Sequence, residues 1–322
     1  MSLAADADAA LFPALPGTEP EGPPVDPRFE GGTAFVDGEY VPILEARIPL
    51  IDRGFLRSDA TYDVFHVWRG YAFRLEDHLD RFERNMGKLH FKIPYAKAEI
   101  GEICLECVRK SGLTEAFVLM TTTRGFGPRG TRDPRLCTNR FYAYAVPFVW
   151  IADEAARGRG FNLHVSKIER IRPQSVDPTV KNFHWIDLTM GQMEAYDAGC
   201  DTEVLVDSEG HITEGPGFNV FVVKGGKITT PEGGVFDGMT RRTVIEMAAE
   251  LQNPVTERLV SIAELSEADE VFLSSTAGGI IPVTQIDGKP LGDGKPGRLT
   301  KRMHDLYWGQ KAKGWLGTKV YG

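Results

Sequence analysis

A lysine in an apolar stretch and a glutamate further along the chain are the residues that most clearly suggest chemistry. Lys181 lies in the run TVKNFHW at positions 179–185, and Glu214 lies in TEGPGFNV at positions 213–220. Burial disfavours a charged ammonium group, so such a lysine becomes a neutral nucleophile that condenses with an aldehyde. A glutamate can hold a pyridinium nitrogen protonated. Together they predict pyridoxal phosphate (PLP) chemistry, although a solvated lysine and a turn glutamate are the ordinary alternatives for each residue alone.

An enzyme of this kind also needs an anion site for the cofactor phosphate. The segment Gly238-Met239-Thr240 precedes a helical pattern and would supply backbone N–H groups, a hydroxyl and the positive end of a helix. Thr276, followed by Ala277-Gly278-Gly279, offers a second hydroxyl beside exposed amides. Arg81 has the planar guanidinium that clamps phosphate through two N–H groups. An ordinary N-cap for Thr240 and a solvated helix face for Arg81 are the alternatives.

These motifs, in this order, resemble the class IV (fold-type IV) PLP-dependent aminotransferases, and the (R)-selective amine transaminases are the most similar group within them. The resemblance covers about residues 33–310 and rests on the segments 73–81, 177–182, 213–219, 238–241 and 276–279. It implies a two-domain α+β fold like that of D-amino acid aminotransferase, with the active site at the domain junction. It also implies PLP as the cofactor and a homodimer whose active sites each take a loop from the partner subunit.

The resemblance assigns a role to each matching residue. Lys181 is implied to be the catalytic residue that forms a Schiff base with PLP, and Glu214 is implied to bind the pyridine nitrogen. The implied cofactor-binding residues are Arg81, Lys181, Glu214, Met239, Thr240 and Thr276. The implied substrate-binding residues are Arg57, Tyr62, Val64, Phe117, Arg129, Trp185, Ser275 and Ala277.

Two of these arginines bear on the choice of substrate. Arg129, in GPRGTR at 127–132, matches the mobile arginine that similar enzymes use for a substrate carboxylate, with a plain basic surface loop as the alternative. Arg57 stands where the amine transaminases usually carry histidine, so it favours a substrate with a carboxylate. Arg57 could equally pair with Asp52 or Asp59 and never meet the substrate.

The resemblance therefore implies a transaminase that moves the amino group of an (R)-configured primary amine to a keto acid such as pyruvate. A D-amino acid aminotransferase, or a mixed-specificity enzyme like the branched-chain aminotransferases, is the nearest alternative and is favoured by Arg57 and Arg129. A PLP lyase of the aminodeoxychorismate type, which releases pyruvate without a keto-acid acceptor, is a more distant alternative. A non-enzymatic binding protein is disfavoured because the lysine, glutamate, arginine and threonines are all in place.

Composition limits the classes of function further. The 322 residues carry a net charge of −8, which argues against the basic surface that nucleic-acid binding requires. No apolar stretch reaches the roughly 18 residues of a membrane span. The four cysteines are expected to be free thiols in the cytoplasm. Cys104 and Cys107 form a lone C-x-x-C at helical spacing, which we interpret as two core residues, so no metal site is expected.

The elements that position these residues follow from the hydrophobic pattern. Apolar residues recur every three or four positions from Leu75 to Leu89, which predicts an amphipathic helix. The segment 33–41 predicts a hairpin with an Asp-Gly turn, and the segment 51–68 is predicted as strand and loop. Further helices are predicted at 185–198, after Gly238 and at 298–312, and strands at 116–123, 140–146, 203–206, 218–223 and 270–275.

Strands that come in groups with helices between them favour an α+β fold in two domains over a doubly wound βαβ repeat. A passage that begins at Pro147 and ends at Gly160 separates the two groups. We therefore predict an N-terminal extension at 1–30, a small α+β domain at 31–148 and a large α+β domain at 149–322.

Overall fold

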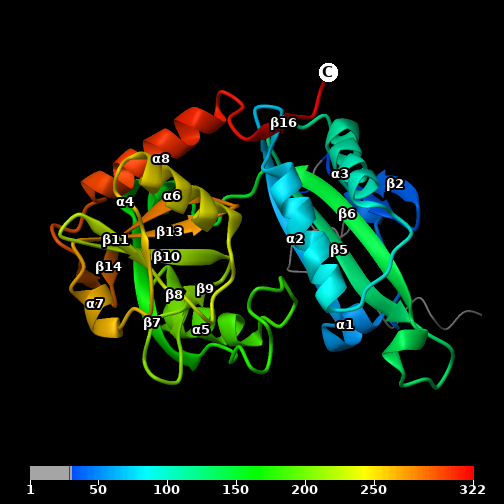
Figure 1. Cartoon of the computed structure of the whole chain (residues 1–322), viewed down its shortest axis with the longest axis horizontal. Coiled ribbons are helices and arrows are strands. Elements are labelled where there is room, and N and C mark those ends of the chain that lie inside the picture. The colour runs from blue at the N-terminus through cyan, green and yellow to red at the C-terminus, as the bar shows by residue number, and fades with distance from the viewer. Residues whose placement is uncertain (1–28, 30) are drawn as a thin grey trace, which may run out of the picture.

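The computed structural model describes residue 29 and residues 31–322, so the predicted N-terminal extension at 1–30 lies outside the described residues except for its residue 29. Two lobes lie side by side in Figure 1, and each is built on its own β-sheet with helices packed against it. The mixture of helices and largely antiparallel sheets confirms the predicted α+β class. Within the described residues no helix is long and apolar enough to cross a membrane.

The first lobe contains a seven-stranded antiparallel sheet in the order β16-β4-β3-β5-β6-β1-β2. Its strands are β1 (Thr33–Val36), β2 (Glu39–Pro42), β3 (Ala60–Trp68), β4 (Tyr71–Phe73), β5 (Ala116–Phe126), β6 (Thr138–Pro147) and β16 (Gly317–Lys319). Its helices are α1 (Arg53–Arg57), α2 (Leu75–Lys88) and α3 (Lys97–Ser111), with short 3₁₀ turns at Ile43–Glu45 and Pro134–Leu136.

The second lobe contains a nine-stranded mixed sheet in the order β12-β11-β10-β13-β14-β7-β8, with β15 beside β14 and β9 beside β10. Its strands are β7 (Phe161–Glu169), β8 (Thr202–Val206), β9 (Glu214–Gly215), β10 (Phe218–Lys224), β11 (Lys227–Thr230), β12 (Thr256–Glu257), β13 (Glu270–Ser275), β14 (Gly279–Ile286) and β15 (Lys289–Pro290). Its helices are α4 (Glu154–Arg159), α5 (Ile186–Asp197), α6 (Met239–Glu250), α7 (Ile262–Ser266) and α8 (Arg298–Lys311).

Helix α2 forms where the hydrophobic period predicts it. Its residues Leu75, Leu79, Phe82 and Met86 are buried in the core of the first lobe, so one face of the helix is anchored to the sheet. Burying each large apolar side chain contributes about 1.5–3 kcal/mol relative to leaving it exposed. This anchoring fixes the position of Arg81, which lies on the same helix and is also buried.

The predicted hairpin and the predicted C-x-x-C core pair are both confirmed. Strands β1 and β2 pair across a turn in which Asp37 and Gly38 have φ angles of 53° and 89°, the left-handed conformation of a type I′ turn. Cys104 and Cys107 lie on α3 and are fully buried in the core of the first lobe. The prediction for 51–68 is wrong in part, because the side chain of Asp52 caps a five-residue helix, α1, before strand β3 begins.

The chain ends by returning to the first sheet. Strand β16 pairs with β4, although helix α8 immediately before it packs against the second sheet. The last residues therefore link the two lobes. The predicted domain division near residue 148 stays a prediction, and β16 lies in the sheet of the first lobe although it follows that division in the sequence.

Candidate active site

A cavity that is partly open to solvent lies where α2 of the first lobe meets the second sheet and the start of α6. Many of its lining residues are those that the sequence predicted to bind cofactor or substrate. They are Arg81, Lys181, Trp185, Glu214, Met239, Thr240, Ser275 and Thr276.

Lys181 is held in place through its own backbone. Its carbonyl accepts hydrogen bonds from the hydroxyl of Thr61 at 2.7 Å and from the backbone N–H of Tyr62 at 3.2 Å, so strand β3 fixes the start of the loop before α5. Its Nζ lies 4.7 Å from the ring centroid of Tyr62 and 4.6 Å from that of Phe236. The amine is therefore presented to the cavity between two aromatic rings.

The surroundings make Lys181 an easier proton donor than a solvated lysine. Burial, helped by the positive charge of Arg81, lowers the pKa of Lys181 to about 8, and the carboxylates of Asp63 and Glu214 only partly oppose this shift. A substantial fraction of the amine is then neutral at pH 7–8, whereas an ordinary lysine with a pKa of about 10.4 is almost fully charged. The amine can act as a nucleophile or as a base.

Glu214, in the short strand β9, is buried and held by two hydrogen bonds. Its Oε1 accepts from Nε of Arg170 at 3.1 Å, and its Oε2 accepts from the backbone N–H of Phe236 at 2.8 Å. Arg170 in turn donates to Asp187 at 2.6 Å. Burial raises the pKa of Glu214, and the neighbouring Arg170 opposes that shift. Each carboxylate oxygen accepts one hydrogen bond here and has capacity for another, which a protonated ring nitrogen would use.

Arg81 is positioned by a buried carboxylate on the neighbouring strand. Its Nε and Nη2 donate to the two oxygens of Asp63 at 2.7 and 2.8 Å, and its Nη1 donates to the carbonyl of Asp237 at 2.7 Å. His78 contacts the same carboxylate through Nδ1 at 2.8 Å. Burial would raise the pKa of Asp63, but Arg81 and His78 hold it well below its usual range. Asp63 is therefore an anion that fixes one edge of the Arg81 guanidinium.

The first turn of α6 supplies unpaired backbone donors to the same cavity. Its N-cap residue is Gly238, and no side chain caps the helix. An added Cβ at Gly238 would lie 2.3 Å from Oδ1 of Asn219, so the close packing there requires glycine. The N–H groups of Met239 and Thr240 remain directed outward from the helix start, where the helix dipole favours an anion.

Another part of the cavity wall is formed by the end of strand β13 and the turn that follows it. The Ser275 hydroxyl donates to the carbonyl of Gly217 at 2.8 Å and so ties the turn to the loop after Glu214. The neighbouring Ser274 is buried against the cavity, and its hydroxyl has no hydrogen-bond partner among the described residues. A buried hydroxyl without a partner is costly unless a ligand satisfies it.

The residues present fit PLP. The lowered pKa of Lys181 suits an amine that condenses with an aldehyde, and Glu214 suits the ring nitrogen. The uncapped start of α6, with Arg81, Thr240 and Thr276 around the cavity, has the donors a phosphate needs. Phe236 and Trp185 give the cavity aromatic surface for the ring.

Six of the eight predicted substrate residues do not line this cavity. Tyr62 is adjacent to it, since its ring stacks on Phe183 at 4.8 Å between centroids and faces the Lys181 amine. Val64 and Phe117 lie on the same face of the first sheet as Tyr62 but farther along β3 and β5. The six residues are Arg57, Tyr62, Val64, Phe117, Arg129 and Ala277.

Arg57 and Arg129 are exposed rather than gathered at the cavity. The carboxylates that Arg57 was expected to pair with have other partners. Asp52 caps α1 and accepts from the Thr123 hydroxyl at 2.7 Å. Asp59 pairs with Arg124 at 3.0 Å. Neither alternative pairing of Arg57 is therefore formed within the described residues.

Three residues that hold the predicted ones in place were missed by sequence reasoning. Asp63 orients Arg81, and Arg170 with Asp187 orients Glu214. Asp63 carried one available signal, since a charged residue in the middle of the apolar strand TYDVFHVW is costly unless it is paired. Arg170 stands in an arginine-rich loop, where nothing distinguishes it from a solvated side chain.

The chain is similar to known proteins over most of its length. Residues 60–286 match the family model described as amino-transferase class IV. The chain is 30% identical over 290 residues to a putative branched-chain-amino-acid aminotransferase of Methanocaldococcus jannaschii, covering 89% of this chain and 98% of the relative. It is 26% identical over 275 residues to a D-alanine aminotransferase of Staphylococcus haemolyticus, covering 84% and 95%.

A solved structure shares the fold. The branched-chain amino acid aminotransferase of Thermobaculum terrenum, determined in its PLP form, superposes with a TM-score of 0.81 at 27% identity, covering 90% of this chain and 98% of that chain. The predicted fold type is thereby confirmed, and the predicted group of (R)-selective amine transaminases is not among the names of these relatives.

Proposed function

The chain belongs to the class IV aminotransferases and uses PLP, and we propose that it transfers the amino group of an amino acid, of the branched-chain or D-alanine kind, to a keto acid. The main observation behind this proposal is that Lys181 and Glu214 line the same cavity. The amine has a lowered pKa and the carboxylate is buried and hydrogen-bonded. These are the base and the acidic partner that transamination requires.

Each residue has a separate task in this proposal. PLP, when bound, acts as the electron sink for the carbanion that forms at the substrate carbon bearing the amino group. Nζ of Lys181 takes the proton from that carbon, because its lowered pKa leaves a substantial fraction of it neutral at physiological pH. The carboxylate of Glu214, which accepts a hydrogen bond from Arg170, would stabilise a proton on the ring nitrogen. Arg81, Thr240, Thr276 and the start of α6 hold the phosphate.

The names of the relatives support an amino acid as the donor. The relatives described above are named for branched-chain amino acids or D-alanine. Arg57 and Arg129 are exposed and do not line the cavity, so their positions add no support for this donor.

An (R)-configured primary amine is the second candidate donor, and one observation favours it. The cavity contains two guanidinium groups. That of Arg81 is fixed by Asp63 and assigned to the cofactor phosphate, and that of Arg170 is engaged by Asp187 and Glu214. The cavity lining, within the described part of the chain, therefore offers no free guanidinium to a substrate carboxylate. An amine with an apolar substituent would not need one.

Donor competition tests the proposal. The holoenzyme is supplied with D-alanine, L-leucine, (R)-1-phenylethylamine or (S)-1-phenylethylamine and a keto-acid acceptor, and kcat/KM is measured for each. We expect one of the amino acids to exceed both amines by about tenfold, or roughly 1.4 kcal/mol in transition-state free energy. A faster reaction with the (R)-amine would establish the second candidate. Turnover that persists in Lys181→Ala would refute the assignment of the catalytic lysine.

We also propose that the protein forms a homodimer, because large apolar side chains are exposed on two segments of the chain. Contiguous exposed apolar surface commonly marks a protein interface. Sedimentation of the purified protein should give twice the chain mass of 35.6 kDa, and a monomer at all concentrations would exclude the dimer. The exposed residues are Ile48, Leu50, Ile51, Phe55 and Leu56 around α1, and Ile186, Met190, Met193 and Tyr196 on α5.

The cytoplasm is the compartment we propose for this enzyme. All four cysteines are free, and three of them are buried in the folded chain. Free thiols are typical of proteins kept in a reducing environment. Fractionation of the source cells, with the activity assayed in each fraction, tests this placement, and recovery outside the cytoplasm would contradict it.

A further inference from the structure

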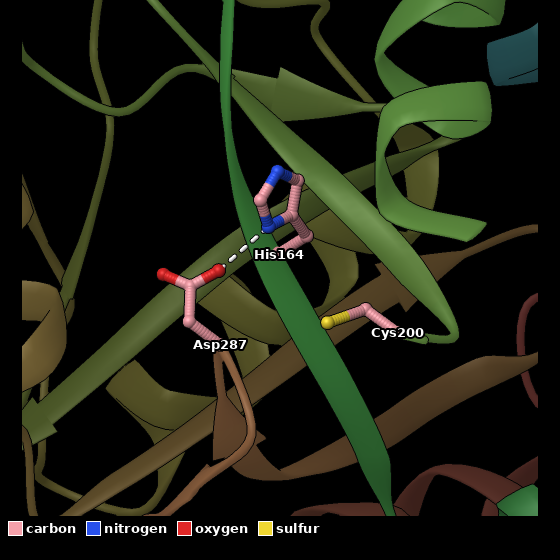
Figure 2. A group of neighbouring side chains, drawn as sticks. All are labelled: His164, Cys200 and Asp287. Atoms are coloured by element: carbon pink, nitrogen blue, oxygen red, sulfur yellow. Dashed lines mark hydrogen bonds and ion pairs between the residues drawn. The ribbon is translucent and has the colours of Figure 1, made fainter. Parts of the chain in front are cut away.

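Three side chains that can bind metal ions meet on the second lobe, outside the active-site cavity. Figure 2 shows His164 on β7, Cys200 just after α5 and Asp287 in the turn after β14, gathered around one point. Their ligand atoms lie within 4.8 Å of one another. We propose that His164, Cys200 and Asp287 bind a single thiophilic divalent metal ion, of which Zn²⁺ is the best chemical match.

The local structure holds each of the three side chains toward that point. Asp287 adopts a left-handed φ of 48° in a tight Asp-Gly turn, and its N–H donates to the carbonyl of Leu163 at 2.9 Å. Its Oδ1 lies 2.6 Å from Nδ1 of His164 and also accepts from the N–H of Val165 at 3.2 Å. The N–H of Cys200, just beyond the end of α5, donates to the carbonyl of Ala195 at 2.8 Å. The turn, the strand and the helix end thus converge independently.

The histidine lies between two carboxylates. Its Nδ1 faces Asp287, while its Nε2 lies 3.8 Å from the carboxylate of Glu194. That carboxylate is fixed by the hydroxyl of Ser166 at 2.5 Å and the N–H of Lys167 at 3.0 Å. At 3.8 Å it makes no hydrogen bond to the ring, and Nε2 has no partner among the described residues. Glu194 therefore adds negative charge beside the proposed site without being a ligand.

The neighbouring acidic residue is not available as a competing ligand. Asp201, next to Cys200 in the chain, is bound by Arg159 through two contacts of 2.5 and 2.7 Å, and it accepts from the N–H of Asn162 at 2.7 Å. The set facing the common point is therefore one nitrogen, one sulfur and one oxygen. Thiolate and imidazole together favour Zn²⁺ over Mg²⁺ or Ca²⁺, which prefer oxygen ligands.

The ligand atoms must shift to close around an ion. Bond lengths of about 2.0–2.3 Å to nitrogen, oxygen and sulfur require tetrahedral ligand atoms roughly 3.5 Å apart. Nδ1 of His164 and Oδ1 of Asp287 lie 2.6 Å apart and must separate, whereas pairs at the longer distances, up to 4.8 Å, must draw together. Asp287 is exposed, so its carboxylate is free to turn away from the imidazole. When the ion binds, the Cys200 thiol releases its proton to solvent, and the proton shared by Nδ1 of His164 and Asp287 moves to Nε2 of the imidazole. A water molecule takes the fourth position.

The bound ion would tie together β7, the end of α5 and the turn between β14 and β15. Helix α5 begins beside Trp185 at the cavity and ends three residues before Cys200, so the ion would lie roughly 18 Å from the cavity along its 12 residues. We therefore expect the ion to stabilise the second lobe without taking part in transamination. The proposal stands independently of the donor specificity proposed above.

The test uses Co²⁺ as a spectroscopic probe and Zn²⁺ as the competing ion. The holoenzyme is treated with a chelator, dialysed and titrated with Co²⁺, with the untreated holoenzyme as the spectral reference. We expect saturation at about one Co²⁺ per chain, a sulfur-to-cobalt charge-transfer band, and displacement of the band by Zn²⁺. Cys200→Ser should remove the band and lower the affinity at least about 100-fold while leaving transaminase activity unchanged.

Two further variants keep the test decisive. Cys137→Ser changes the one cysteine of the chain that is not buried and should leave the band and the stoichiometry intact. Asp287→Asn retains the shape of the side chain and should lower the affinity for both ions at least about tenfold. Absence of a saturable cobalt signal in the wild type, or an unchanged band in Cys200→Ser, would overturn the proposal.

Discussion

Replacing Asp63 by asparagine should weaken both the fold and the phosphate site, because Asp63 is the buried anion that holds Arg81. The carboxylate is fully buried and contacts Arg81 at 2.7 and 2.8 Å and His78 at 2.8 Å. Asparagine keeps one acceptor oxygen but turns a donor N–H₂ group toward the guanidinium. At least one charge-assisted hydrogen bond is then lost, and the Arg81 charge is left without its counter-ion.

The magnitude follows from these contacts. Hydrogen bonds to charged groups contribute about 1.5–3 kcal/mol each, and removing one partner of a buried ion pair costs about 3–5 kcal/mol. We expect Asp63→Asn to lower the free energy of unfolding of the apoenzyme by about 3 kcal/mol. If the freed Arg81 loses about 1.4–2.8 kcal/mol of its interaction with phosphate, PLP affinity falls about 10–100-fold.

Urea unfolding measures the loss of stability, and titration with PLP measures the loss of cofactor affinity. A variant of another aspartate, on the helix that carries Arg81, serves as the control. Asp80 also lies on α2, but it pairs with Lys97 at the surface, so Asp80→Asn removes an ion pair that water screens. Both variants are compared at one protein concentration by tryptophan fluorescence. The reasoning fails if Asp63→Asn unfolds at the same urea concentration as Asp80→Asn and binds PLP as tightly as the wild type.

Two more predictions concern the residues that face the cofactor. Glu214→Gln should lower kcat by at least about 100-fold, or roughly 2.7 kcal/mol, since an amide cannot stabilise the ring proton as a carboxylate does; the exposed Glu209→Gln is the control, and equal rates would contradict the role of Glu214. Raising the pH removes the proton from Lys181, whose pKa is about 8. The rate at which the apoenzyme binds PLP should therefore rise about tenfold between about pH 7 and about pH 9 and then level off. A rate that still climbs steeply at about pH 10, as measured by stopped-flow absorbance, would mean that this lysine has the pKa of a solvated one.

The helices and strands that the sequence predicted are those whose signal is local. Helix α2 was predicted from a repeat of buried residues on one face, and the β1–β2 turn from the Asp37-Gly38 pair. In each case the stabilising interaction lies within a few positions of the residues that make it, so the pattern can be read along the chain.

Three of the elements that were not predicted were missed for different reasons. Strand β16 depends on pairing with β4, which lies far away in the sequence, and three residues carry too little pattern. Strand β14 contains Pro282 and begins at Gly279, both of which are typical turn signals. Helix α1 is five residues long, too short for a hydrophobic period, and depends on the cap from Asp52. The three residues of the proposed metal site also lie far apart in the sequence, so they do not form a short metal-binding motif that could be recognised there.

The same distinction separates the two kinds of residue in the active site. Lys181, Glu214 and Arg81 line the cavity and stand in recognisable motifs. Arg81 and Glu214, however, depend on buried side chains from other segments. Arg81 is fixed by Asp63 on β3, and Glu214 by Arg170 in the loop after β7. Leaving a buried charge without its partner would cost about 3–5 kcal/mol, so these contacts also decide whether the motif residues can be buried in the orientation that their chemistry needs. Transfer of the motifs alone to another scaffold would therefore reproduce the residue types without their orientation.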